Sequence, residues 1–341
     1  MILKSTLDKA AQENILSPEQ VEPLFQFLQN EHADDHSSTI LAERRDEPLK
    51  FVRSFGDVFI ALGVVLLVLA INVANLANYE YILPAIVFIG LAEWLVRVRK
   101  LVLPGMVILL SIIYFVYKAI PFDNGNGTFI GLSIICITSL LFYLRYKMPF
   151  SLFPFSVALV ALFATFISFD ILENPIIFSG FGLIIFAVAF WFDSLDTKRV
   201  SHLSDNAFWL YLLASPLIVH GVMISLLLGD WQWIKSLNIE VVMMAFFVIF
   251  FLISLLIDRR VMLISIQMYM IYALSQVMQS KADNEQEVLI YVLVALSLFV
   301  IYFGAYWYKT RQIIFGFISS TFMNHYIPDL NKREDNKIKR H

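Results

Sequence analysis

Four acidic and histidine residues lie close together in the segment from 193 to 206: Asp193, Asp196, His202 and Asp205. Carboxylates and imidazole are suitable ligands for divalent metals. Their spacing matches no fixed ligand motif, however, and two basic residues lie among them, so a solvated loop is the preferred interpretation. No phosphate-binding loop, metalloprotease helix motif or nucleophile elbow occurs elsewhere in the chain. The sequence therefore predicts no catalytic residue, no metal and no cofactor.

His220 is the most distinctive polar residue within an apolar stretch. Pro216 lies four residues before it and has no N–H to donate to the carbonyl of Leu212. A free carbonyl beside an imidazole could line a proton or substrate path. The alternative, which we favour, is a histidine that bonds to a neighbouring helix. An unpaired imidazole is costly in hydrocarbon, so we expect His220 to face the interior of a bundle.

Other polar residues lie within apolar stretches and complete a candidate intramembrane site with His220. Gln267 and Gln276 lie in one stretch, where Tyr269, Tyr272 and Gln276 share a helical face. We expect interhelical hydrogen bonds there rather than a channel wall. Glu93 lies four residues before Arg97, a spacing that predicts an ion pair along one helix. Asn72 we expect to bond across a helix pair.

The elements that must position these residues are membrane-spanning helices. The chain is 59% hydrophobic and only 16% charged, whereas globular proteins average about 45–50% apolar and about 25% charged residues. A span needs roughly 17 or more apolar residues. Ten stretches qualify: 55–77, 81–97, 101–120, 127–145, 149–169, 175–192, 207–228, 238–257, 261–279 and 287–307. We predict an all-α, polytopic membrane bundle of about ten helices over residues 55–307, with the lipid bilayer as its surroundings.

The first of these stretches carries small residues at every seventh position, namely Gly56, Gly63, Ala70 and Ala77. Small side chains allow another helix to approach closely. We therefore expect this helix to be the centre of the bundle. The expectation implies that Gly63→Leu disrupts assembly more than Leu66→Ala.

Basic residues predict the orientation of the bundle. The loops after the even-numbered stretches hold nine Lys and Arg residues, whereas those after the odd-numbered stretches hold three. This alternation predicts that both termini are cytoplasmic, in a bacterial inner membrane.

Two polar regions flank the predicted bundle. Residues 1–29 are typical of a helical hairpin whose second helix begins at Ser17, with Gln20 closing a capping box. Residues 1–50 hold five basic and ten acidic residues, which excludes a nucleic-acid surface and leaves docking of a protein partner through residues 2–29. Residues 30–54 are predicted to be a polar linker, and 308–341 an interfacial helix followed by a basic tail.

The N-terminal quarter resembles a family of bacterial predicted membrane proteins, the domain of unknown function 2157 group. The residues that carry the resemblance are Asn14-Ile15-Leu16-Ser17-Pro18-Glu19-Gln20-Val21, Gly56, Ile60-Ala61-Leu62-Gly63-Val64-Val65, Ala70 and Asn72. Asn14 stands where the family usually has Gly, and the family's Trp after the Asn is missing. The resemblance covers roughly residues 2–80 and implies a multi-span inner-membrane protein without a known activity.

Three functions are compatible with these observations. The first is a non-enzymatic membrane protein with a cytosolic docking hairpin. The second is a secondary transporter that uses the polar site near His220. Its ten helices would divide into two halves of five, and an odd number of helices in each half gives the two halves opposite orientations in the membrane. Pro84 and Pro216 lie in the second helix of each half. The third, which we rank last, is a membrane enzyme with its site in the 193–206 loop. The sequence leaves the oligomeric state undetermined.

Overall fold

The computed structural model describes residues 7, 11, 13, 17, 20–26, 54–120, 127–166, 174–197, 199, 201–228, 238–279, 285–316 and 327. The chain divides into two units, Met1–Lys50 and Phe51–His341. Within the described part every regular element is helical, which confirms the predicted fold class at that level.

The first unit preserves the predicted cap of its second helix. The N–H of Ser17 donates to the side-chain oxygen of Gln20 at 3.3 Å, and the N–H of Gln20 donates to the carbonyl of Ser17 at 2.9 Å. Residues 20–26 are helical, and Leu7 and Val21 are buried. Most of the predicted linker and most of the predicted C-terminal region lie outside the described residues.

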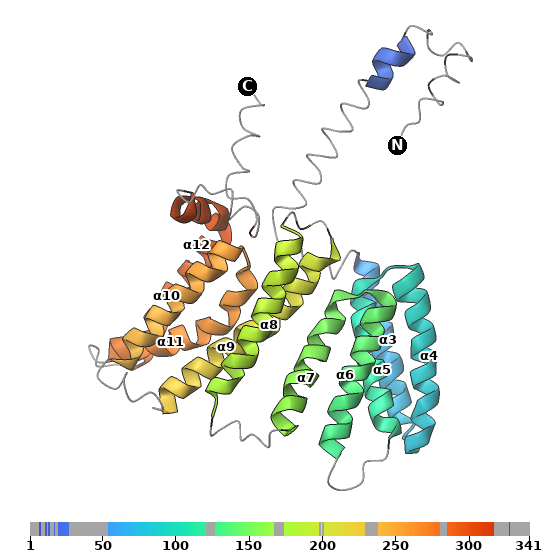
Figure 1. The fold of residues 1–341 in the computed structure, drawn as a ribbon, viewed down its shortest axis with the longest axis horizontal. Helices are drawn as coiled ribbons and strands as arrows, with labels where there is room; N and C mark the ends of the chain where they lie inside the picture. Colours follow the sequence, from blue (N-terminus) through green and yellow to red (C-terminus); the bar gives the residue numbers. More distant parts are fainter. Residues whose placement is uncertain are drawn as a thin grey trace. The chain divides into compact units, whose positions relative to one another are not determined.

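The second unit is a bundle of long helices (Figure 1). A 3₁₀ turn, η1 (Asn78–Tyr81), precedes α4, and a π-helix, η2 (Glu93–Val98), follows it. Two further 3₁₀ turns, η3 (Pro149–Ser151) and η5 (Arg260–Met262), precede α7 and α11. The helices are α3 (Phe55–Val73), α4 (Ile82–Ala92), α5 (Val102–Ala119), α6 (Gly127–Tyr146), α7 (Leu152–Phe166), α8 (Ile176–Leu195), α9 (His202–Leu228), α10 (Ile239–Ile257), α11 (Leu263–Gln279) and α12 (Glu285–Phe315).

Each of the ten predicted stretches overlaps one of these helices. In the described residues, nine helical segments are long and apolar enough to cross a membrane. The tenth, α11, has 17 residues, which places it at the lower length limit for a span. The count of ten spans therefore stays a prediction.

Proline marks the start of several helices. Pro84, Pro104 and Pro154 each lie at the third position of α4, α5 and α7, and Pro175 immediately precedes α8. The first turn of a helix has unpaired N–H groups, so proline is tolerated there and its fixed φ favours the helix. Pro216, by contrast, lies in the interior of α9. Pro84 and Pro216 thus lie in the second helix of each half, as the sequence indicates, but one is in a first turn and the other is in a helix interior.

The buried apolar residues form two clusters. One is built from α3 to α6 and includes Phe88 and Phe115, whose rings pack edge to face. The other is built from α8 to α12 and includes Tyr211 and Trp307. Trp209 of α9 packs against the first cluster and contacts Phe150, with ring centroids 4.8 Å apart. We refer to the two groups of helices as the first and second sub-bundles.

The centre of the bundle is α9, and the expectation that the first span is central is wrong. In the most apolar window of α9, 61% of residues are buried, against 17% in α3. Gly56, Gly63, Ala70 and Ala77 are all exposed, and a Cβ added at Gly63 would meet no atom within 4 Å. Ala77 also lies beyond the end of α3. α3 packs mainly on α5, through its Ala61 and Val64 face instead.

Close packing of small residues occurs between α8 and α9. A Cβ added at Gly182 would lie 2.8 Å from the backbone nitrogen of Ile218, and one at Gly221 would lie 2.7 Å from the carbonyl oxygen of Pro175. The hydroxyl of Ser179 donates to the carbonyl of Ile218 at 2.9 Å across the same interface. The two glycines therefore permit an approach that any larger residue prevents.

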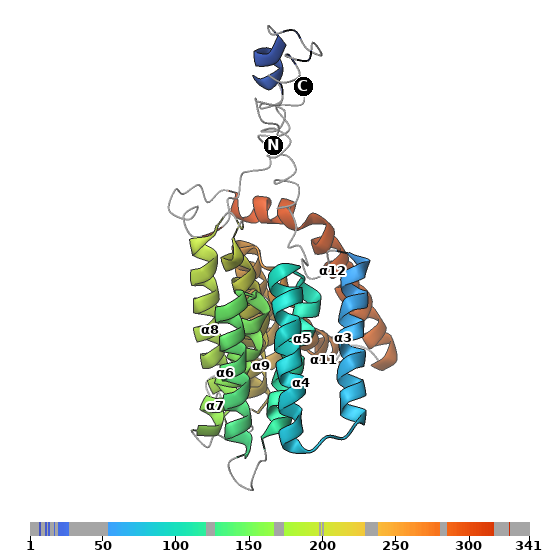
Figure 2. The ribbon, with the colours of Figure 1, turned by 90° about the vertical axis from the view of Figure 1, so that its right-hand side faces the viewer.

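The last helix, α12, is kinked. Tyr306 has φ −112° and ψ 20°, outside the helical region, and Figure 2 shows the two segments of α12 at an angle to each other. The kink lies next to position 307, where the sequence analysis ended the last span. Trp307 and Arg311 follow the kink and are buried, so the final turns of α12 are held against the second sub-bundle.

Candidate functional site

The most extensive polar cluster in the described residues surrounds the turn between α10 and α11. Asp258 ends α10 in the left-handed conformation, with φ 62°, and the N–H of Arg259 donates to the carbonyl of Ser254 at 3.0 Å. This is the geometry of a Schellman-type helix end. It directs the side chains of Asp258 and Arg259 toward neighbouring helices instead of along α10.

Arg259 forms a buried two-pronged ion pair with Asp193 near the end of α8. Its Nε donates to Asp193 Oδ2 at 2.9 Å, and its Nη2 donates to Asp193 Oδ1. The same Nη2 reaches the hydroxyl of Ser204 on α9 at 2.9 Å. The side chains of Arg259 and Asp193 are 3% and 4% exposed, so solvent screens their attraction little. The pair joins α8, α9 and the α10–α11 turn.

Asp258 is bonded on both carboxylate oxygens. Arg199, from the turn between α8 and α9, donates to Oδ2 at 3.0 Å, and the indole N–H of Trp307 donates to Oδ1 at 2.7 Å. Arg260 lies over the ring of Trp307, 5.4 Å from its centroid. These contacts attach the end of α12 to two interhelical turns.

Arginine side chains also satisfy the last carbonyls of α10. Arg311 donates to the carbonyls of Leu255 and Leu256 at 3.0 and 3.1 Å. Arg199 donates to those of Ile257 and Asp258 at 3.1 and 2.9 Å. The final carbonyls of a helix have no partner within it, and the helix dipole favours cations there. The guanidinium groups therefore supply the hydrogen bonds that water or a further helical turn would otherwise give to these carbonyls.

The structure corrects the prediction of a solvated loop over 193–206. Asp193 belongs to α8, and α9 already begins at His202, so the connection spans only 196–201. Asp193 is buried against Arg259, whereas Asp196 accepts hydrogen bonds from the N–H and hydroxyl of Ser201. In the described residues no three His, Cys, Asp or Glu side chains are placed to hold a metal ion. The four residues of the sequence motif thus do not converge on one site.

Sequence analysis missed this network, which we call the arginine network: Asp193, Arg199, Ser204, Asp258, Arg259, Trp307 and Arg311. Arg199, Arg259 and Arg260 served only as topology signals. One available signal was the run Asp258-Arg259-Arg260 directly after an apolar stretch, because such charges at a helix end need partners. The identity of those partners depends on contacts between residues 49 to 66 positions apart.

His220 bonds to a neighbouring helix, as we expected, and this helix is α11. Its Nδ1 is 2.6 Å from the hydroxyl of Tyr269, and the two rings are edge to face. The side chain is nevertheless exposed at the surface of the described bundle, so the expectation of an interior position is wrong. The hydroxyl of Tyr269 satisfies one ring nitrogen of His220 although the ring is exposed. The hydrogen bond therefore does not require His220 to lie in the interior.

The other candidate residues form no hydrogen bond with His220 in the described part of the chain. Asn72 accepts a hydrogen bond from the hydroxyl of Tyr114 at 2.5 Å, which links α3 to α5. Gln267 and Gln276 are partly exposed on α11 and make no hydrogen bond to a described residue. The five candidate residues are therefore distributed over both sub-bundles and form no single site.

Glu93 forms the predicted ion pair with Arg97 and also a second ion pair, with Arg145, that the sequence spacing does not predict. Arg97 Nη1 donates to Oε2 at 3.2 Å along the same helix. Arg145 Nε and the hydroxyl of Tyr146, from the end of α6, reach Oε1 at 2.8 and 3.1 Å. Glu93 thus connects the ends of α4 and α6.

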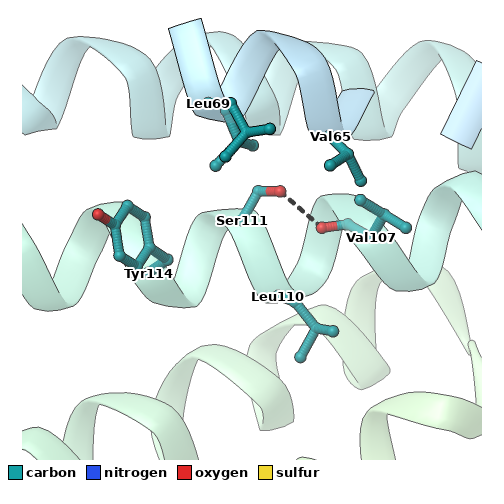
Figure 3. A pocket seen from close by; sticks show the side chains of 7 residues that line it. Val65, Leu69, Val107, Leu110, Ser111 and Tyr114 are labelled. Atoms are coloured by element: carbon teal, nitrogen blue, oxygen red, sulfur yellow. Dashed lines mark hydrogen bonds between the residues drawn. The ribbon is translucent and has the colours of Figure 1, made fainter. Parts of the chain in front are cut away.

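A hollow of about 180 Å³ lies between α3 and α5 (Figure 3). Its lining is apolar except for Ser111 and Tyr114. The hydroxyl of Ser111 donates to the carbonyl of Val107 at 2.7 Å, and that of Tyr114 is bonded to Asn72. The hollow therefore offers apolar surface and no polar group without a partner.

The arrangement as a whole connects helices through paired polar groups. Searches of protein-family models, of curated proteins and of solved structures found no match for this chain.

Proposed function

We propose that this chain is a multi-pass inner-membrane protein of non-enzymatic function, whose bundle is a rigid anchor for a docking hairpin at residues 2–29. One observation carries the proposal: four polar side chains on apolar helices each bond to a neighbouring element. They are the pairs Asn72–Tyr114, Ser179–Ile218, Ser215–Met262 and His220–Tyr269. Polar groups used in this way hold helices together. The arginine network adds a rigid attachment at one end.

The positions of the charged turns support the predicted orientation. Glu93 and Arg145 come from the turns after the second and fourth helices, and Arg199 and Asp258 from those after the sixth and eighth. Residues from alternate turns therefore lie at a common end. Basic residues are enriched on the cytoplasmic side of such proteins, which places this end and both termini in the cytoplasm under the proposal.

The transporter hypothesis is the second candidate, and the exposed His220–Tyr269 pair is the observation that favours it. The contacts between helices oppose a five-plus-five repeat. α8 and α9 make the most extensive contact of any helix pair, whereas α3 and α4, their counterparts in the first half, are not among the packed pairs. An inverted repeat requires equivalent pairs to pack alike.

Reconstitution of the His220→Gln variant separates the two candidates. Glutamine retains hydrogen bonding to Tyr269 but does not titrate between pH 6 and 7. We expect proteoliposomes with the original protein and proteoliposomes with the His220→Gln variant to show the same proton permeability as protein-free liposomes. An internal pH-sensitive dye measures this permeability. A proton flux in the original protein that His220→Gln abolishes, with folding unchanged, would establish transport and overturn the anchor proposal.

A further inference from the structure

Five of the seven exposed lysine and arginine side chains among the described residues of the bundle lie at one end of the first sub-bundle. Arg97, Arg99 and Lys100 lie at and beyond the end of α4, and Arg145 and Lys147 at the end of α6; all five side chains are exposed. Between positions 82 and 166, the carboxylates in the sequence are Glu93 and Asp123, and Asp123 precedes the first residue of α6, Gly127, by four positions. The segments at these two helix ends therefore carry five exposed cations and one carboxylate, Glu93.

Glu93 holds two of these cations at fixed positions. Arg97 and Arg145 each use one N–H on a separate oxygen of Glu93. A guanidinium has five N–H donors in a rigid fork, so each arginine retains donors after this contact. Arginine forks match the oxygen geometry of phosphate. The ends of α4 and α6 thus present two oriented phosphate-binding groups.

Aromatic rings accompany the cations. Arg99 lies over the ring of Trp94, 5.9 Å from its centroid, and Lys147 over that of Tyr143 at 5.6 Å. Trp94 is 53% exposed. Tryptophan and tyrosine are enriched at the level of lipid headgroups, where an apolar ring and a polar edge are both accommodated. Under the proposed membrane location, this pairing of rings with cations fits the level of the lipid headgroups.

The second sub-bundle differs in this respect. Its Arg199 and Arg259 are matched by Asp258 and Asp193, and Arg259 is buried. Those arginines serve the connections between helices. The excess of exposed positive charge is a property of the first sub-bundle.

We propose that Arg97 and Arg145, held by Glu93 and flanked by Arg99, Lys100 and Lys147, bind the phosphate of an anionic phospholipid headgroup. The inference rests on the proposed membrane location. A phosphodiester with a neutral or anionic substituent fits, because its two free oxygens can each accept from one guanidinium. A zwitterionic lipid binds more weakly, because its ammonium or choline group is repelled by the surrounding cations.

The test compares phosphatidylglycerol with phosphatidylcholine on the purified full-length protein in a non-ionic detergent. Retained lipid is counted by native mass spectrometry, and inorganic phosphate at equal concentration is a third probe. We expect phosphatidylglycerol to be retained in preference to the other two. Arg97→Gln with Arg145→Gln lowers its apparent affinity on the order of ten- to thirtyfold, since each basic residue near an anionic surface contributes about tenfold or less.

Two further variants keep the test decisive. Lys118→Gln, an exposed cation at the other end of α5, leaves phosphatidylglycerol retention unchanged. The double variant Lys100→Gln with Lys147→Gln leaves every contact of Glu93 in place, and we expect it to lower phosphatidylglycerol retention. It therefore tests the inference independently of whether the double arginine variant folds. Equal retention of the three probes, or loss of retention with Lys118→Gln alone, overturns the inference. Release of the protein from membranes by alkaline carbonate contradicts the proposed membrane location instead.

Discussion

At the residue scale, the buried pair Asp193–Arg259 is the contact whose disruption we expect to cost the most stability. Removing one partner of a buried ion pair leaves a charge without compensation, at a cost of about 3–5 kcal/mol. We expect Arg259→Met to lower the free energy of unfolding by this amount. Denaturant titration in mixed micelles, followed by circular dichroism, measures it.

The double variant Asp193→Asn with Arg259→Met tests the cause of that loss. Because the two residues contact each other, their effects are not additive, and we expect the double variant to be more stable than the sum of the single changes implies. Arg97→Gln, which breaks an exposed pair with Glu93, is the control and has a small effect. Equal midpoints for Arg259→Met and Arg97→Gln would contradict a stabilising role for the buried pair.

At the scale of elements, the interface between α8 and α9 replaces the stripe on α3 as the tightly packed contact of small residues. We expect Gly182→Leu and Gly221→Leu each to reduce expression and the melting temperature in detergent, because the new side chain would overlap backbone atoms of the partner helix. Gly63→Leu is the matched control on α3, and we expect it to be tolerated. This reverses the expectation from sequence. A Gly63→Leu variant that fails to assemble would show that another chain or helix covers α3.

At the scale of the whole molecule, the topology is the property that most needs measurement. Because basic turns alternate along the chain, reporter fusions after Arg99, Lys147, Lys198 and Arg260 are expected in the cytoplasm. Fusions at Asn124, Asn174, Trp231 and Asn284 are expected on the other side. α11 is the predicted span that is not among the nine described helical segments long and apolar enough to cross a membrane, so the fusions at Arg260 and Asn284 are the most informative. Reporters on the same side of the membrane at these two positions would reduce the number of spans to nine.

Local features of the sequence determined the helices themselves. A long apolar stretch in this chain forms a helix because its backbone groups then pair internally. Ser17 and Gln20 predicted a helix start, and the prolines at positions 84, 104 and 154 lie in first turns, because these effects operate within four residues. Helix content, segment positions and the i,i+4 pair Glu93–Arg97 were therefore available from sequence.

Only the tertiary structure decided which faces pack and which polar groups meet. A helix that is apolar on all sides carries no periodic signal to distinguish a neighbouring helix from lipid. The glycines of α3 and α8 therefore look alike in the sequence, although Gly182 of α8 is tightly packed and Gly63 of α3 is not. Asp193 and Arg259 are 66 residues apart, and no local rule relates them. Their meeting depends on how α8 and α10 pack around α9, and hence the arginine network emerged from the fold.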